Sequence, residues 1–136
     1  MIRVFVYGTL KPGESQYVLC ADRVISSQSA IAHASLYHLQ LGYPAIVPGN
    51  GRTYGYLLTF QNAEILEILD DYEQHDPTEI EPFGSGNDYQ RQEIEVFDLN
   101  QISLGKAWAY VMMQEQVDRL KGVLTPSGIW QKNRPQ

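Results

Sequence analysis

The chain has 136 residues, of which 43% are hydrophobic and 19% are charged, and this composition is typical of a globular protein and not of a disordered tail or a coiled coil. Its length suits one compact core, so we expect residues 1–136 to form a single domain. Sixteen acidic residues against ten basic ones leave a formal charge of −6, which would repel a polyanion, and nucleic acid is therefore not an expected partner.

The first elements carry the alternation of β-strands. A β-branched and aromatic run over residues 2–7 ends at Gly8, which predicts a core strand that enters a turn over residues 8–14. Residues 29–40 repeat the alternation until the Gly42-Tyr43-Pro44 break stops it. We therefore expect two strands in this part of the chain.

A cluster of turn residues follows. A short apolar piece over residues 45–47 precedes Pro48-Gly49-Asn50-Gly51, which predicts a turn, and residues 53–60 form the next predicted strand. Gly55 lies inside that strand, where a missing side chain indicates a bulge, a bend or a close approach by another group.

The clearest helix begins after Asn62, whose side chain can cap it, and Glu64 suits the positive first turn. Its apolar residues share one face, which must pack on the sheet; they are Ile65, Leu66, Ile68, Leu69 and Tyr72. The segment over residues 74–88 holds two prolines and two glycines and predicts a long loop.

The last elements are, in order, a strand over residues 89–99, a turn over 100–105, a strand over 107–113 that pairs with its predecessor as a hairpin, and a short helix over 114–120. Residues 125–128 predict an irregular tail that folds back through Ile129 and Trp130. Five or six strands with one sheltering helix predict an α+β fold. We expect a small, mostly antiparallel β-barrel with one main flanking helix and short helical pieces, because closure protects edge strands in so short a chain.

The turn after the first strand presents backbone N–H groups that could cradle an anion. Gly8 and Gly13 have the spacing of a phosphate-binding P-loop, but Glu14 and Ser15 stand where that motif requires Lys and then Ser or Thr. The mechanism of the motif depends on that lysine, so a nucleotide site is not predicted. An ordinary strand-ending turn stays open as the alternative to an anion site.

Four carboxylates gather at the predicted end of the helix: Asp70, Asp71, Glu73 and Asp76. The negative end of the helix dipole disfavours them there. Glu73 follows Leu69 by four residues and can therefore face inward against the apolar stripe. Burial and the dipole would both raise the pKa of Glu73 toward neutrality, as a general acid/base requires. We interpret Asp70 and Asp71 as surface charges, and a solvated helix end stays open for the whole cluster.

Arg91 shares one face of its predicted strand with Tyr89, Glu93 and Glu95. It could pair with a carboxylate on a neighbouring element, and the alternative is pairing within the sheet to Glu93 or Glu95.

Metal and redox chemistry have little support. His33, His38 and His75 show no metal-ligand spacing, so no metal site is predicted. The only cysteine, Cys20, excludes an internal disulfide, and we expect it to be a small buried residue because nothing nearby would lower its thiol pKa. A single cysteine suits a reducing compartment, and we see neither a signal-peptide pattern nor a bilayer-crossing segment of ~20 apolar residues. We therefore expect a cytoplasmic protein without a membrane partner.

Several motifs occur in a fixed order along nearly the whole chain. They are Val6-Tyr7-Gly8-Thr9-Leu10-Lys11-Pro12-Gly13, Gly42-Tyr43-Pro44-Ala45, Leu69-Asp70-Asp71-Tyr72-Glu73, Tyr89-Gln90-Arg91 and Ala107-Trp108-Ala109-Tyr110-Val111. Together they resemble the gamma-glutamylcyclotransferase-like family in its short, bacterial-type form.

The resemblance implies a small β-barrel with flanking helices, a cavity at its mouth and a small-molecule gamma-glutamyl substrate. The backbone of Tyr7, Gly8, Thr9 and Leu10 would hold the α-carboxylate of the gamma-glutamyl group, and Glu73 matches the catalytic acid/base of the family. Three further residues would line the site: Tyr43, Arg91 and Tyr110. The implied reaction forms 5-oxoproline from a gamma-glutamyl amine or amino acid and needs no cofactor.

One departure leaves the function open. The segment between Glu73 and Tyr89 is longer and more acidic than the short form of the family leads us to expect. It could select the leaving amine or merely decorate the surface. A non-catalytic module that binds a gamma-glutamyl or carboxylate ligand on the same fold is the main alternative, and different chemistry on a related aminoacylated substrate is a third. The sequence predicts no oligomeric state.

Overall fold

The computed structural model describes residues 1–8, 10–14, 17–40, 42–74 and 89–130, and for residues 71–74 it describes the backbone alone. Within these ranges the strands are β1 (Ile2–Val6), β2 (Val24–His38), β3 (Pro44–Phe60), β4 (Gln90–Phe97), β5 (Ser103–Val111) and β6 (Val123–Leu124). The helices are α1 (Glu64–Gln74) and α2 (Gln114–Arg119), with two 3-10 turns, η1 (Tyr17–Leu19) and η2 (Ala21–Arg23). Gln74, the first residue of the loop predicted over residues 74–88, ends α1, and residues 75–88 lie outside the described residues.

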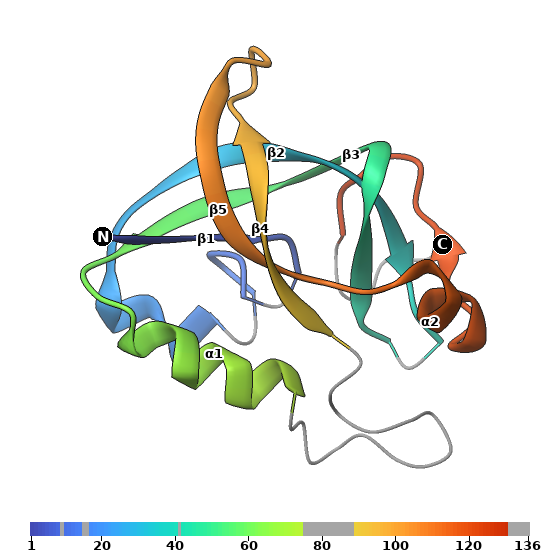
Figure 1. Ribbon diagram of the computed structural model, residues 1–136, viewed down its shortest axis with the longest axis horizontal. Coiled ribbons are helices and arrows are strands. Elements are labelled where there is room, and N and C mark those ends of the chain that lie inside the picture. Colours follow the sequence, from blue (N-terminus) through green and yellow to red (C-terminus); the bar gives the residue numbers. More distant parts are fainter. Residues whose placement is uncertain (9, 15–16, 41, 75–88, 131–136) are drawn as a thin grey trace.

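The strands form one sheet in the order β3-β1-β5-β4-β2-β6, and β2 pairs in addition with β3. This extra pairing returns the sheet to its first strand, so that five strands follow one another in a closed ring of pairings; Figure 1 shows them curving around a common centre. Strands β1 and β5 run parallel, and the other described pairs are antiparallel. The predicted α+β class and the hairpin of β4 with β5 are therefore confirmed.

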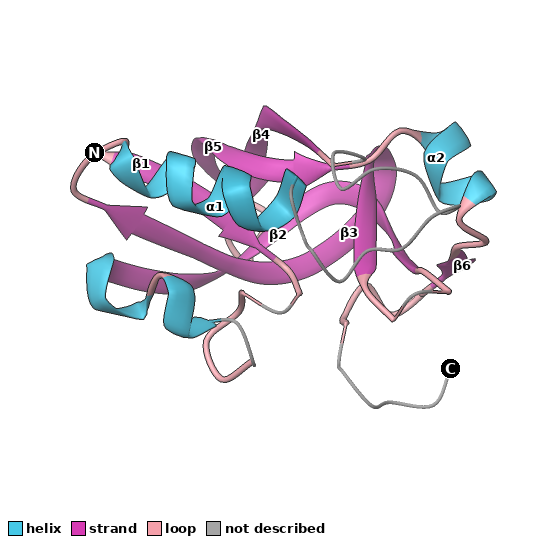
Figure 2. Ribbon diagram, turned by 90° about the horizontal axis from the view of Figure 1, so that it is seen from below, coloured by secondary structure: helices cyan, strands magenta, loops and turns pink. Residues whose placement is uncertain are grey.

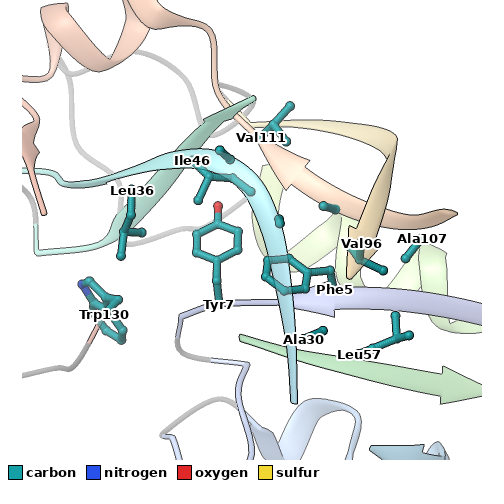
Figure 3. Packing of buried hydrophobic residues seen from close by; sticks show 13 residues of the cluster. Phe5, Tyr7, Ala30, Leu36, Ile46, Leu57, Val96, Ala107, Val111 and Trp130 are labelled. Carbon is teal, nitrogen blue, oxygen red and sulfur yellow. The ribbon is translucent and has the colours of Figure 1, made fainter. Parts of the chain in front are cut away.

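Each strand of the ring contributes residues to one buried cluster, which Figure 3 shows from close by. Small alanines at alternate positions of β2 and β5 leave room for larger side chains. Phe5 and Tyr7 stack with ring centroids 6.2 Å apart. Trp130 joins the cluster and is 1% exposed, which confirms the predicted return of the tail, whereas Ile129 is 44% exposed and takes no part in it.

Helix α1 lies along the outside of the strands (Figure 2) and buries Ile65, Leu66 and Leu69 of the predicted apolar stripe, with Ile68 partly buried beside them. The side chain of Tyr72, the last residue of that stripe, lies outside the described part of the structure. Asn62 Oδ1 accepts the backbone N–H of Glu64 at 3.1 Å, as expected of a cap. A second cluster of buried residues lies between the helix and the strands; it contains Val4, Val6, Leu10, Cys20, Leu58, Phe60, Ile65, Leu66, Leu69 and Tyr110. Cys20 is 1% exposed, so its predicted burial is confirmed. Neither α1 nor α2, the helices of the described part of the chain, is long and apolar enough to cross a membrane.

The turn predicted over residues 48–51 is wrong, because β3 runs through it. Between Ala32 and Ala34, two positions apart on β2, the partner on β3 moves from Thr53 to Pro48. The extra residues of β3 between these two partners form an irregularity in the ladder, and the two strands stay paired on both sides of it. The glycines and the proline that indicated a turn therefore lie at this irregularity within one long strand.

Candidate active site

The turn after β1 packs closely against Pro44, the first residue of β3. A Cβ atom built on Gly8 would lie 2.5 Å from Pro44 Cγ, so the close approach of these two residues requires glycine. The backbone N–H of Lys11 donates to the carbonyl oxygen of Gly8 at 3.0 Å, and Leu10 is 4% exposed beneath α1. Thr9 lies outside the described residues.

Pro44 also connects this turn to the start of β4. The Tyr89 hydroxyl donates to the Pro44 carbonyl oxygen at 2.5 Å. Tyr43, which precedes Pro44, is half-buried, and its carbonyl oxygen accepts the backbone N–H of Leu39 at 2.8 Å. The first two family motifs and the fourth thus meet around one proline.

Tyr110 joins β1, β5 and α1. Its backbone carbonyl oxygen accepts a hydrogen bond from the Tyr7 hydroxyl at 2.6 Å, and its own hydroxyl donates to Asp70 Oδ1 at 2.6 Å. Tyr110 is 3% exposed. Two hydrogen bonds therefore link the end of β1 to the C-terminal half of α1, although these elements lie far apart in the chain.

Arg91 approaches the same carboxylate from β4. Its Nη1 atom lies 3.5 Å from Asp70 Oδ2, and each of the two side chains keeps 29% of its surface exposed. The guanidinium carbon lies 5.0 Å from the ring centroid of Trp108, a cation–π geometry. Arg91 therefore pairs with a neighbouring element, one of the two alternatives that the sequence left open.

The interpretation of Asp70 as a surface charge is wrong. Its carboxylate is half-buried and contacted on both oxygens. The sequence held a signal for this, because Asp70 follows the buried Leu66 by four residues, the same spacing that relates Glu73 to Leu69. The partner on β4 could not be deduced from that spacing.

Glu73 lies in the last turn of α1, three residues after Asp70, and its side chain is outside the described part of the structure. Residues three apart occupy the same side of an α-helix. The described contacts therefore connect Tyr7, Tyr110 and Arg91 with the helix position that neighbours Glu73.

Lys11 is a further polar residue that the sequence treated only as part of the turn motif. It is 8% exposed, and its Nζ atom donates to the Trp130 carbonyl oxygen at 2.6 Å. Burial lowers the pKa of Lys11, and the charge of Glu14 partly opposes that shift. Lys11 thus ties the tail of the chain to the segment that carries the candidate site.

A depression at the N-terminal end of α1 lies apart from these residues. It is lined by Asp22, Arg23, Val24, Ile25, Phe60, Gln61, Asn62 and Ile65, none of which belongs to the predicted site. Among the residues that the structure describes, no three histidine, cysteine, aspartate or glutamate side chains gather as metal ligands would.

Residues 4–132 match the family model described as "Gamma-glutamyl cyclotransferase, AIG2-like". The gamma-glutamylcyclotransferase family protein YtfP of Escherichia coli K12 is 36% identical over 131 residues, which cover 95% of this chain and 96% of that protein. The solution structure of ytfP from Escherichia coli aligns with a TM-score of 0.56 at 32% identity, covering 95% of this chain and 96% of that one. An AIG2-like protein of Mus musculus aligns over 99% of this chain and 91% of its own with a TM-score of 0.59, and at 20% identity that likeness concerns the fold alone.

Proposed function

This chain belongs to the AIG2-like gamma-glutamyl cyclotransferase family, and on that basis we propose that it cyclises a gamma-glutamyl amine or gamma-glutamyl amino acid to 5-oxoproline. The α-amine of the substrate attacks its own γ-carbonyl carbon, and a new C–N bond closes a five-membered ring. The bond from that carbon to the leaving nitrogen then breaks, and the amine departs. The attacking nitrogen loses one proton and the leaving nitrogen gains one, so the reaction needs no cofactor.

Intramolecular attack depends mainly on orientation, because both reacting groups belong to one molecule. In the proposed site the backbone of Tyr7, Gly8, Thr9 and Leu10 holds the α-carboxylate, which fixes the adjacent α-amine. Glu73 takes the proton from that amine and returns one to the leaving nitrogen, a role typically worth ~10² to 10⁴ in rate. Tyr43, Arg91 and Tyr110 shape or support the site.

The observation that carries the proposal is the pair of hydrogen bonds through Tyr110. They join the strand that leads into the anchoring turn to the helix that bears Glu73. A carboxylate anchor and an acid/base from distant parts of the chain must converge if they are to act on one substrate. The cytoplasm is the proposed location, and a single buried cysteine suits that reducing compartment.

The proposal is tested by incubating the purified protein with a panel of gamma-glutamyl amines and amino acids and assaying 5-oxoproline by mass spectrometry. Glu73→Gln preserves the shape of the side chain but cannot relay protons, so we expect a loss of at least ~10²-fold in kcat. Equal turnover by this variant would remove Glu73 from the mechanism.

The binding-module alternative has its own signature. A ligand that raises the melting temperature and is recovered unchanged supports binding without turnover, because only the native state gains from occupancy. Products of another mass would indicate different chemistry on a related substrate.

A further inference from the structure

Asp70 is held at both oxygens of its carboxylate by two different strands. Tyr110 on β5 donates its hydroxyl to Oδ1 at 2.6 Å, and Arg91 on β4 places Nη1 3.5 Å from Oδ2. The strand residues are themselves paired across the hairpin, since Arg91 lies opposite Tyr110 in the register. One carboxylate thus bridges the helix to a matched pair of strand residues.

This location is costly for a carboxylate unless it is compensated. Asp70 lies toward the negative end of the helix dipole, and α1 has no basic residue in its last turn. Its side chain has also lost about seven tenths of its solvent exposure, with 29% remaining. The cation of Arg91 and the hydroxyl of Tyr110 supply the polar partners that a half-buried carboxylate requires.

Arg91 is itself held in place. Its guanidinium lies over the Trp108 ring at 5.0 Å from the centroid, and Trp108 lies on β5 two residues before Tyr110. Asp70 therefore meets a cation whose position is set by the sheet, not a freely moving surface side chain.

We infer that Asp70 is a positioning residue, which fixes the last turn of α1 on β4 and β5 and thereby sets the place of Glu73 relative to the turn after β1. The inference rests on the proposed function for its catalytic consequence. Position 73 is three residues beyond Asp70 on the same side of the helix, so a shift of Asp70 on the sheet moves Glu73 with it. The link from Tyr110 to Tyr7 extends the same frame to β1.

The test compares Asp70→Ala, Asp70→Asn and a control on the same helix. Asp70→Ala removes both contacts, whereas Asp70→Asn keeps an oxygen that can accept the Tyr110 hydroxyl but loses the charge opposite Arg91. The control is Glu64→Gln, which removes another carboxylate of α1 that forms an ion pair, with Arg23 at 2.9 Å; its side chain is 61% exposed and lies at the opposite end of the helix.

Hydrogen exchange of the backbone amides over residues 71–74 measures whether Asp70 holds the end of the helix, and this measurement does not require the protein to be catalytically active. We expect exchange to quicken roughly tenfold in Asp70→Ala, less in Asp70→Asn and not in Glu64→Gln, because local opening follows the contacts that oppose it. The same exchange in Asp70→Ala as in the wild type would overturn the inference. Should the alanine variant fail to fold, the asparagine variant decides in the same way.

Steady-state kinetics measure the catalytic consequence. We expect kcat to fall by about 10- to 100-fold in Asp70→Ala, with KM within about twofold and a smaller loss in Asp70→Asn, because a displaced acid/base slows the chemical step and leaves the carboxylate anchor intact. Quicker exchange with unchanged kcat overturns the positioning role. A wild type that is inactive on every compound refutes the proposed function and this catalytic consequence together. The exchange measurement then still decides whether Asp70 fixes the last turn of α1.

Discussion

The hydroxyl of Tyr7 donates a hydrogen bond to the backbone carbonyl oxygen of Tyr110 at 2.6 Å, and 103 residues of chain separate the two. Both residues are buried, Tyr7 at 7% and Tyr110 at 3% exposed. The bond crosses between the parallel pair β1 and β5, whose described ladder contains the single register pair Val4 with Trp108. A side chain thus reinforces the shortest described pairing between the strands of the ring.

Tyr7→Phe should lower the free energy of unfolding by about 1–2 kcal/mol, because a buried carbonyl loses the donor that this hydroxyl supplies. Urea unfolding followed by circular dichroism measures the change. The matched control is Tyr37→Phe, since the Tyr37 hydroxyl donates to Gln114 Oε1 at 3.3 Å in an exposed position; we expect less than about 0.5 kcal/mol there. Equal losses in the two variants would contradict a special role for the bond to Tyr110.

Gly8→Ala should disturb both stability and substrate binding. The added Cβ would meet Pro44 Cγ at 2.5 Å, and forcing the two apart typically costs about 1–3 kcal/mol. If the turn anchors the substrate, KM for the best gamma-glutamyl compound should rise about tenfold or more, since a displaced anchor weakens binding.

The control for that variant is Gly49→Ala. Gly49 has no atom within 4 Å of a built Cβ and no positive φ, so alanine there should leave stability within about 0.5 kcal/mol of the wild type and KM unchanged. A Gly8→Ala protein that behaves like Gly49→Ala would show that the contact with Pro44 relaxes without consequence.

The sequence predicted those features that depend on local periodicity. The alternation over residues 2–7 and the apolar stripe from Ile65 to Leu69 identified a core strand and a covering helix, because residues two or three to four apart share a face whatever the rest of the chain does. The order of motifs identified the family.

Features that depend on a distant partner could not be predicted in this way. Residues 48–51 have turn composition, and only the continuous pairing of β2 with β3 on both sides shows that they form an irregularity within a strand. Asp70 lies in a cluster of carboxylates typical of a solvated helix end, and only the structure shows that Arg91 on β4 and Tyr110 on β5 contact it. In both cases local preference was overruled by tertiary pairing.

Lys11→Met tests the link between the turn segment and the tail. The variant keeps much of the side-chain volume but loses the donor to the Trp130 carbonyl oxygen, 2.6 Å from Nζ. Amide exchange over residues 128–130 should therefore quicken several-fold. An unchanged exchange rate would mean that the burial of Trp130 in the core holds the tail without help from Lys11.

The same variant has a pH signature with a definite sign. Burial lowers the pKa of Lys11 below 10.5, so the unfolded chain holds this proton more strongly than the folded one, and stability rises with pH between the folded and unfolded pKa values. The difference in unfolding free energy, wild type minus Lys11→Met, should become more favourable to the wild type as pH approaches 10.5. A difference that stays flat or falls with pH would show that burial does not lower the pKa of Lys11.

Cys20 should act in the opposite direction at alkaline pH. Burial raises the pKa of its thiol from 9.0 to about 11, so the folded chain keeps a proton that the unfolded chain releases. The stability from this group is full below pH 9.0 and is lost as pH rises toward about 11. Unfolding in urea under reducing conditions should therefore show a steeper alkaline decline for the wild type than for Cys20→Ala, although the alanine variant is less stable at neutral pH because it leaves a small cavity.

Thiol reagents at pH 8 should react slowly with the native protein and readily once urea is added, since the thiolate is the reactive form; rapid labelling of the native protein would show that Cys20 is neither buried nor held protonated.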